Sequence, residues 1–114
     1  MIYLASPYTH ERPTIMQDRF EEACRIAGEL MGQGLVVFSP IAHTHPIAVA
    51  CLLPRDWQYW EKFDREFIAA SDKVVVAKMH GWKESRGVRA EIEIASGLGK
   101  PVEYLYVCGC GGCE

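Results

Sequence analysis

Short apolar runs alternate with longer amphipathic segments, and this alternation constrains the fold more than any other feature of the sequence. Residues 2–5 and 35–38 are apolar runs, each closed by a Ser-Pro pair. Over residues 15–33, apolar side chains recur at steps of three and four, the period of a helix. A strand, a helix and a strand in this order form a βαβ unit, which favours a parallel sheet with a right-handed crossover.

The rest of the chain continues the alternation with one interruption. The pattern predicts helices over residues 55–71 and 88–98 and strands over 73–78 and 101–107. Residues 41–54 contain two prolines and show no clear period, so we expect a long loop with about one helical turn. The predicted fold class is α/β: a small doubly wound parallel sheet of about four to five strands, flavodoxin-like or Rossmann-like, with helices on both faces.

Composition narrows the class of protein. The 114 residues, 49% of them hydrophobic and 24% charged, suffice for one domain with its own core. We predict a single domain over residues 1–107 and a flexible Cys/Gly-rich tail over residues 108–114. A net charge of −3 provides no basic surface for a nucleic-acid duplex, and the longest uncharged apolar stretch, 47–53, is too short to span a membrane. We therefore expect neither as a partner.

The cysteines indicate a reducing compartment. Their number, five, is odd, and Cys24 and Cys51 stand alone in apolar surroundings. We expect buried thiols in a cytoplasmic protein, because a disulfide framework needs paired cysteines and the N-terminus does not resemble an export signal. Cys108, Cys110 and Cys113 provide three of the four ligands of a zinc or iron–sulfur site, which favours incidental thiols over a soft-metal or intersubunit element.

Two carboxylates fall on the core-facing side of predicted helices. Glu91 lies within the apolar stripe of residues 88–98, whereas Glu93 points nearly opposite. Asp64 lies on the aromatic face of its helix, between Trp60 and Phe67. An inward carboxylate costs several kcal/mol unless it is paired, hydrogen-bonded or lines a cavity. The two acids therefore predict a shared polar pocket; the alternative is that they pair with neighbouring arginines or cap a loop.

A polar turn precedes the helix that carries Glu91. Ser85, Arg86 and Gly87 stand at its N-terminus, where free backbone N–H groups and the helix dipole favour an anion such as phosphate. Ser85 is equally suited to be a plain N-cap. In a doubly wound fold the loops after the first three strands meet at one crevice, where ligands bind.

The histidines form a second candidate cluster. His43 and His45 follow a strand end, and in extended chain their side chains point the same way. With His10 they can bind zinc, contact a phosphate or a base, or simply pack in a polar loop. Acidic or cysteine partners at ligand spacing are missing, so we favour base or phosphate contact and predict no metal and no cofactor. Trp57 and Trp60 can stack on a nucleobase or belong to the core.

Three motifs in this order resemble the nucleoside 2-deoxyribosyltransferase superfamily, including its 2'-deoxynucleoside 5'-monophosphate N-glycosidase branch. They are the opening strand IYLASPY (2–8), Asp64 eight residues before Asp72, and SRGV (85–88) leading to Glu91 with Gly-Lys behind it (99–100). The chain departs from the superfamily in having Ser-Pro-Tyr at positions 6–8, where glycines are common, and in its HTHP segment and cysteine tail.

The resemblance implies roles for individual residues. Glu91 would be the nucleophile at the anomeric carbon, Asp64 the acid near the base, and Tyr3 the group that holds Glu91 in line. At the position of Ser85 the transferase branch has an aspartate for the sugar 5'-hydroxyl, whereas the glycosidase branch has a serine for a 5'-phosphate. The residues expected to bind the substrate are Ser6, Tyr8, His10, His43, His45, Ser85, Arg86 and Gly87.

The function that the resemblance implies is cleavage or exchange of the N-glycosidic bond of a 2'-deoxynucleoside 5'-monophosphate. The reaction would pass through a covalent glutamyl-deoxyribosyl intermediate, as in retaining glycosidases. The expected partners are a small nucleotide substrate and further copies of the chain, in a homodimer or higher homo-oligomer. The alternatives are a non-catalytic nucleotide-sensing module of the same fold and a metal hydrolase built on His43 and His45.

Overall fold

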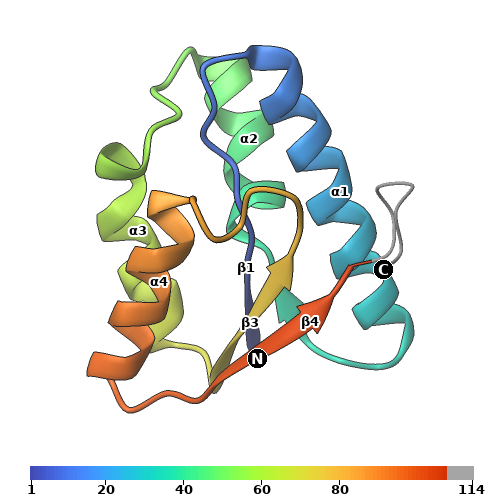
Figure 1. Cartoon of the computed structure of the whole chain (residues 1–114), viewed down its shortest axis with the longest axis vertical. Helices are drawn as coiled ribbons and strands as arrows, with labels where there is room; N and C mark the ends of the chain where they lie inside the picture. Colours follow the sequence, from blue (N-terminus) through green and yellow to red (C-terminus); the bar gives the residue numbers. More distant parts are fainter. Residues whose placement is uncertain (108–114) are drawn as a thin grey trace.

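The computed structural model describes residues 1–107 and shows an α/β fold (Figure 1). Four parallel strands form one sheet in the order β2-β1-β3-β4. The elements in chain order are β1 (Ile2–Ala5), α1 (Pro13–Gly32), β2 (Val37–Phe38), α2 (Pro40–Cys51), α3 (Trp57–Ala69), β3 (Lys73–Lys78), α4 (Arg86–Gly97) and β4 (Val102–Tyr106). The predicted fold class is confirmed. The predicted tail and its three cysteines lie outside the described residues.

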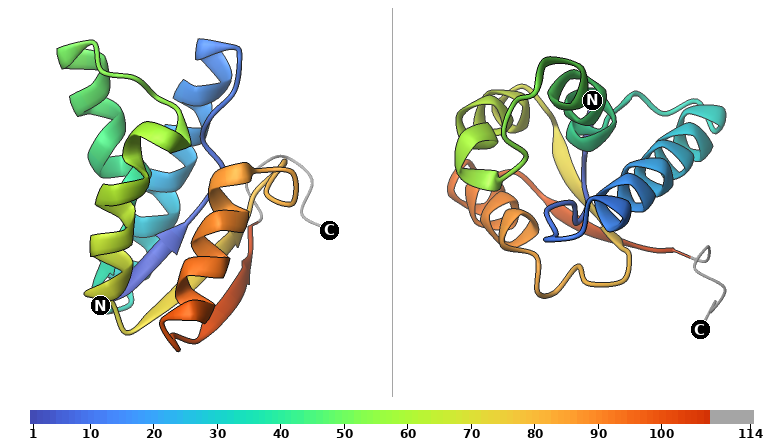
Figure 2. Two further views of the ribbon diagram at one scale, coloured as in Figure 1. Left: turned by 90° about the vertical axis from the view of Figure 1, so that its left-hand side faces the viewer. Right: turned by 90° about the horizontal axis from the view of Figure 1, so that it is seen from above.

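Helices cover both faces of the sheet (Figure 2). On one face, Leu4 and Val75 pack with Ile26 of α1. On the other, Val74 and Val76 of β3 pack with apolar residues of α3 and α4. Successive residues of β3 therefore serve opposite layers, and four of its six residues are buried. This two-sided burial explains why the strand reads as a continuous apolar run.

Residues 40–51 form a helix, so the prediction of a long loop here was wrong. Ser39 caps its start, because the backbone N–H of Ala42 donates to Ser39 Oγ at 3.1 Å. Pro40 occupies the first turn, where its missing N–H costs nothing. Pro46 lies inside the helix, and the apolar residues of α2 are spread around the helix and do not form a stripe on one face. The helix therefore shows neither the period nor the proline-free interior that sequence analysis looks for.

Two smaller expectations also need correction. The thiols of Cys24 and Cys51 are exposed, because they lie on outward faces of α1 and α2. Helix α4 begins at Arg86, two residues earlier than predicted, since Ser85 acts as its N-cap. Over the described range, no helix combines the length and the apolar character needed to cross a membrane.

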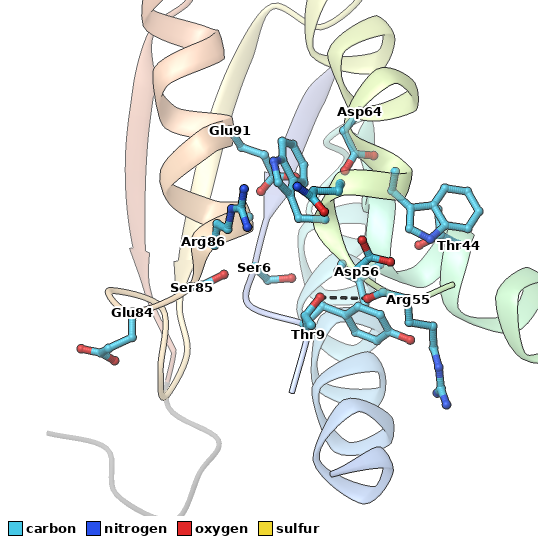
Figure 3. A pocket seen from close by; sticks show the side chains of 16 residues that line it. Ser6, Thr9, Thr44, Arg55, Asp56, Asp64, Glu84, Ser85, Arg86 and Glu91 are labelled. Atoms are coloured by element: carbon cyan, nitrogen blue, oxygen red, sulfur yellow. Dashed lines mark hydrogen bonds between the residues drawn. The ribbon is translucent and has the colours of Figure 1, made fainter. Parts of the chain in front are cut away.

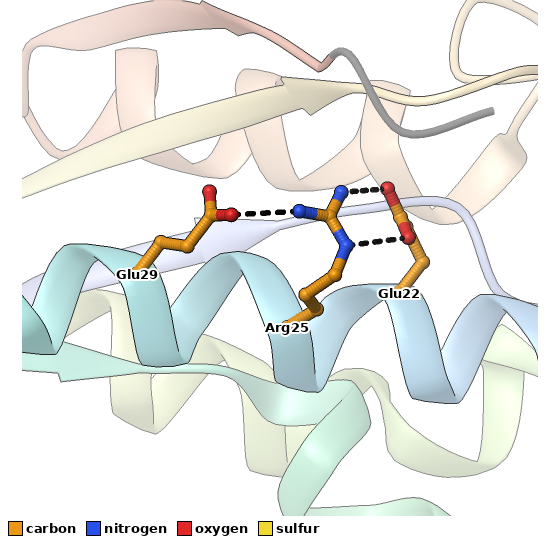
Figure 4. A network of polar contacts seen from close by, with 3 residues as sticks. All are labelled: Glu22, Arg25 and Glu29. Atoms are coloured by element: carbon orange, nitrogen blue, oxygen red, sulfur yellow. Dashed lines mark hydrogen bonds and ion pairs between the residues drawn. The ribbon is translucent and has the colours of Figure 1, made fainter. Parts of the chain in front are cut away.

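The exposed side of α1 carries a small network of charges (Figure 4). Arg25 donates to Glu29 Oε2 at 2.8 Å and forms a two-pronged contact with Glu22. These pairs are three and four residues apart on the same helix, and each contributes about 0.3–0.5 kcal/mol to an exposed helix. The network supports α1 locally and lies outside the cavity described below.

Helix α2 ends at a strained residue that offers a test of its geometry. Leu52 has a left-handed backbone with φ of 55° and is 91% exposed. Because glycine adopts this conformation without steric cost, Leu52→Gly is expected to raise the free energy of unfolding by about 0.5–1 kcal/mol. Urea unfolding measures the effect. The control, Leu52→Ala, keeps the strain and is expected to give no gain; equal stability of both variants would contradict the helix end described here.

Candidate functional site

A cavity of about 340 Å³ opens at the carboxyl ends of the strands (Figure 3). The loop after β1, helix α2 and the N-terminal halves of α3 and α4 form its walls. In a parallel sheet this edge is where the strand order leaves a crevice, and its volume is within the range of small-molecule sites. The fold therefore provides one concave site where β1, α3 and α4 meet.

The centre of the site is a buried hydrogen bond between a strand and a helix. The Tyr3 hydroxyl on β1 donates to Glu91 Oε2 on α4 at 2.5 Å. Tyr3 is fully buried, and Glu91 and Asp64 are only 4% and 5% exposed. Both carboxylates line the cavity, as their helical spacing predicted. Helices α3 and α4 thus each place one buried acid beside β1, the strand that carries Tyr3.

Burial controls the protonation of these groups. It raises the pKa of Asp64 from 3.8 to about 7. Burial, together with the charge of Asp64, also raises the pKa of Glu91 well above 4.5, and the Tyr3 hydrogen bond acts against that rise. The pKa of Tyr3 lies well above 10.0, through burial and the two acids, so its hydroxyl remains a donor. Burial thus favours the protonated form of both acids more than in a carboxylic acid exposed to water.

Two buried polar atoms in the site have no hydrogen-bond partner among the described residues: Ser6 Oγ and Asp64 Oδ1. Both side chains line the cavity. A buried group without a partner costs about 1–3 kcal/mol, so such groups are rare in a folded protein. Because both atoms lie in one cavity, we infer that they are available to hydrogen-bond the polar atoms of a ligand.

One side of the cavity presents hydrogen-bond donors. Ser85 Oγ accepts from Val88 N at 3.2 Å, so the Ser85 hydroxyl proton is free to donate. Within residues 1–107, the backbone N–H groups of Arg86 and Gly87 have no acceptor, and the Arg86 guanidinium has no carboxylate partner. Figure 3 shows Ser6, Ser85 and Arg86 gathered on this side. Donors at a helix N-terminus suit an anion such as phosphate.

The two histidines of the HTHP segment lie outside the cavity wall and face different neighbours. His45 is buried, with Nδ1 at 2.6 Å from Tyr8 Oη and Nε2 at 2.9 Å from Gln17 Oε1. His43 instead packs beside Phe38 and Phe67. The expectation that they point the same way was wrong, because the segment is helical and residues two apart on a helix diverge by about 200°.

His10 is also absent from the cavity wall; its Nδ1 accepts from Arg12 N at 3.0 Å. In the part of the chain that the structure describes, no three His, Cys, Asp or Glu side chains are grouped so that they could hold a metal ion. Of the residues expected to bind substrate, the cavity is lined by Ser6, Tyr8, Ser85, Arg86 and Gly87.

The structure adds residues that the sequence analysis did not select. These are Thr9, Thr44 and Asp56, whereas Trp57 and Trp60, which also line the cavity, were already candidates for stacking on a base. Asp56 had one sequence signal, since an aspartate before a helical segment is a typical N-cap. Thr44 had none, because its helix was not predicted.

The fold and the site together define a class: parallel α/β proteins with a cavity, lined by buried acids, at the carboxyl edge of the sheet. The chain matches, over residues 1–106, the family described as domain of unknown function (DUF1937). It therefore belongs to the DUF1937 family. A comparison with curated proteins gives no match.

The raised pKa of Asp64 predicts a stability effect with a definite sign. The folded chain holds the Asp64 proton more tightly than the unfolded chain does, so this group stabilises the fold at low pH. That contribution is lost as the pH rises from about 4 to about 7. Asp64→Asn removes the loss and is expected to be more stable than the wild type at pH 8, by about 1–3 kcal/mol. Urea unfolding at pH 5 and pH 8 measures the difference.

The control for that experiment is Asp18→Asn, which removes one carboxylate from the exposed side of α1. It is expected to leave the difference between pH 5 and pH 8 unchanged. If Asp64→Asn were less stable than the wild type at pH 8, the carboxylate would be a stabilising ion in the folded chain, contrary to its buried position.

Proposed function

We propose that the protein cleaves or exchanges the N-glycosidic bond of a 2'-deoxynucleoside 5'-monophosphate, as the resemblance to the nucleoside 2-deoxyribosyltransferase superfamily implies. The observation that carries the proposal is the Tyr3–Glu91 hydrogen bond beside Asp64, in a cavity with unpartnered polar atoms. A purely structural pair of acids needs no cavity, and a retaining glycosidase needs both a nucleophilic carboxylate and an acid.

In the first step Glu91 acts as the nucleophile. Its carboxylate attacks the anomeric carbon of the sugar, the carbon–nitrogen bond breaks, and the electron pair leaves with the base. Asp64 gives its proton to the departing base, and a pKa of about 7 suits a general acid at neutral pH. The Tyr3 hydrogen bond to Glu91 opposes the rise in the Glu91 pKa and so favours the charged form that a nucleophile needs.

The second step releases the sugar. Water, or a second base in an exchange reaction, attacks the anomeric carbon of the glutamyl ester, and the ester bond breaks to restore the Glu91 carboxylate. Asp64, now ionised, takes the proton from the attacking water. The overall reaction with water gives the free base and deoxyribose 5-phosphate, and all protons return to their original positions.

The donors at the α4 N-terminus support a phosphate at one end of the substrate. Ser6 follows the last residue of β1 and lies three residues beyond Tyr3, at most about 10 Å along an extended chain. Ser85 lies six residues before Glu91 on α4, a rise of about 9 Å. Along their own chain segments, Ser6 and Ser85 are therefore about equally far from Tyr3 and Glu91, and both line the cavity. A sugar between these two pairs of residues places its reacting carbon at Glu91 and its 5'-phosphate among the donors.

A second candidate function is a nucleotide-sensing module without turnover. The observation that favours it is the raised pKa of Glu91, because a protonated carboxylic acid is a poor nucleophile. A sensor would use the same cavity and donors but would not need the acid to ionise. The two functions differ in one measurable property, the release of free base.

Replacement of the nucleophile tests the proposal directly. Glu91→Gln is expected to lower the rate of base release from deoxynucleoside monophosphates by at least about a thousandfold, because the amide cannot form the covalent intermediate. Chromatography of the free base measures the rate, and calorimetry measures binding, which is expected to persist. The control, Glu93→Gln, changes an exposed acid on the same helix and is expected to keep full activity. Unchanged base release by Glu91→Gln would refute the covalent mechanism through Glu91, whereas no release by the wild type would favour the sensor.

The phosphate assignment predicts a charge effect at Ser85. Aspartate is a good N-cap, so Ser85→Asp is expected to preserve α4 while it places a negative charge beside the phosphate. The affinity for monophosphates is expected to fall by at least about tenfold, and that for the matching nucleosides to change little. Titration calorimetry with both ligands measures this. Equal losses for nucleoside and nucleotide would place the phosphate elsewhere.

A further inference from the structure

The side of the cavity opposite the α4 N-terminus has the reverse hydrogen-bonding character. There α2 and α3 meet the loop after β1, and the polar side chains include Thr9, Thr44 and Asp56. The direction of each internal hydrogen bond determines what these groups can still offer to a ligand. A hydroxyl whose proton is already donated to a carbonyl can only accept.

The hydroxyl groups of both threonines already donate their protons to backbone carbonyl oxygens. Thr44, which is 7% exposed, donates to the Pro40 carbonyl oxygen at 2.8 Å. Thr9 donates to the Arg55 carbonyl oxygen at 2.9 Å. Each hydroxyl therefore presents only lone pairs to the cavity. The indole N–H of Trp60 is also committed, since it donates to the Pro54 carbonyl oxygen at 2.7 Å.

Asp56 adds a carboxylate to this side. It occupies the N-cap position of α3, yet its side chain makes no capping hydrogen bond. Among the described residues it also forms no ion pair, although Arg55 is its neighbour in sequence. Figure 3 shows Arg55 extending away from Asp64 and Glu91. The Asp56 oxygens are thus available to a ligand, and the unpartnered, buried Asp64 Oδ1 faces the same cavity.

The cavity therefore has mainly donors at the α4 end, where the Glu84 carboxylate is the exception. The α2–α3 end has mainly acceptors; the exceptions are the donors of Arg55 and Trp57, and the Gln58 amide, which offers both. If the phosphate lies at the donor end, the base lies at the acceptor end. We propose that this end recognises a base that carries an exocyclic amino group. An amino group donates two protons, whereas a carbonyl at the same place would face carboxylate and hydroxyl lone pairs. The proposal rests on the proposed function for the position of the phosphate.

The test compares monophosphates that differ by one amino group. The pairs are guanine and hypoxanthine, adenine and unsubstituted purine, and cytosine and 2-pyrimidinone, each as the deoxynucleoside 5'-monophosphate. The wild-type protein is expected to favour the amino-bearing member of at least one pair by about tenfold or more in kcat/KM for base release. A ratio within about threefold for all three pairs, or a preference for the members without the amino group, would overturn the proposal.

Binding to the Glu91→Gln variant provides a second readout that does not depend on turnover. The same preference is expected in Kd, so an absence of base release from the wild type would refute the enzyme while the specificity remains tested. Asp56→Asn is expected to reduce the preference to about threefold or less, because the amide offers one donor and one acceptor in place of two acceptors. Asp18→Asn, on α1, is the control and is expected to retain the preference. Failure of every nucleotide to bind would overturn both the specificity and the proposed function.

Discussion

The hydrogen bond from Tyr3 to Glu91 is the contact on which the site depends. It joins the central strand β1 to α4 inside the core, 88 residues apart in the sequence, and both groups are almost completely shielded from water. The bond sets the position of Glu91 beneath the cavity, and the helix then sets the height of its own N-terminus above it. One polar contact between layers therefore fixes the distance between the acid and the anion-binding end of the site.

Burial of the two acids around this contact explains why the site costs stability. Burial raises the pKa of both Asp64 and Glu91, so the fold is strained electrostatically when both acids are ionised. A chain under selection for stability alone would fill these positions with apolar side chains, as it does at the neighbouring core residues. The retained acids, the open cavity and the unpartnered Ser6 hydroxyl together are the reason to regard this region as functional.

Helix α2 contributes to the side of the cavity that accepts hydrogen bonds. It rises beyond the carboxyl edge of the sheet before the chain turns back into α3, and Figure 1 shows these two helices and α4 around that edge. Thr44 of α2 and Asp56 at the start of α3 contribute the acceptors that oppose the donors of α4. His45 serves a different purpose, because its bonds to Tyr8 and Gln17 attach α2 to the loop after β1 and to α1.

The sequence by itself determined the layers, the parallel sheet and the inward direction of Glu91 and Asp64. These follow from short-range periodicity, because a residue's face on a helix or strand depends only on its neighbours along the chain. Tyr3 as the partner of Glu91 was expected from the family resemblance and not from periodicity, and the structure contains that hydrogen bond. Only the tertiary structure decided that His43 and His45 diverge and that Asp56 and Thr44 line the cavity. Those facts depend on how separate elements pack and, for α2, on a capped helix that tolerates an internal proline, and neither leaves a periodic pattern in the sequence.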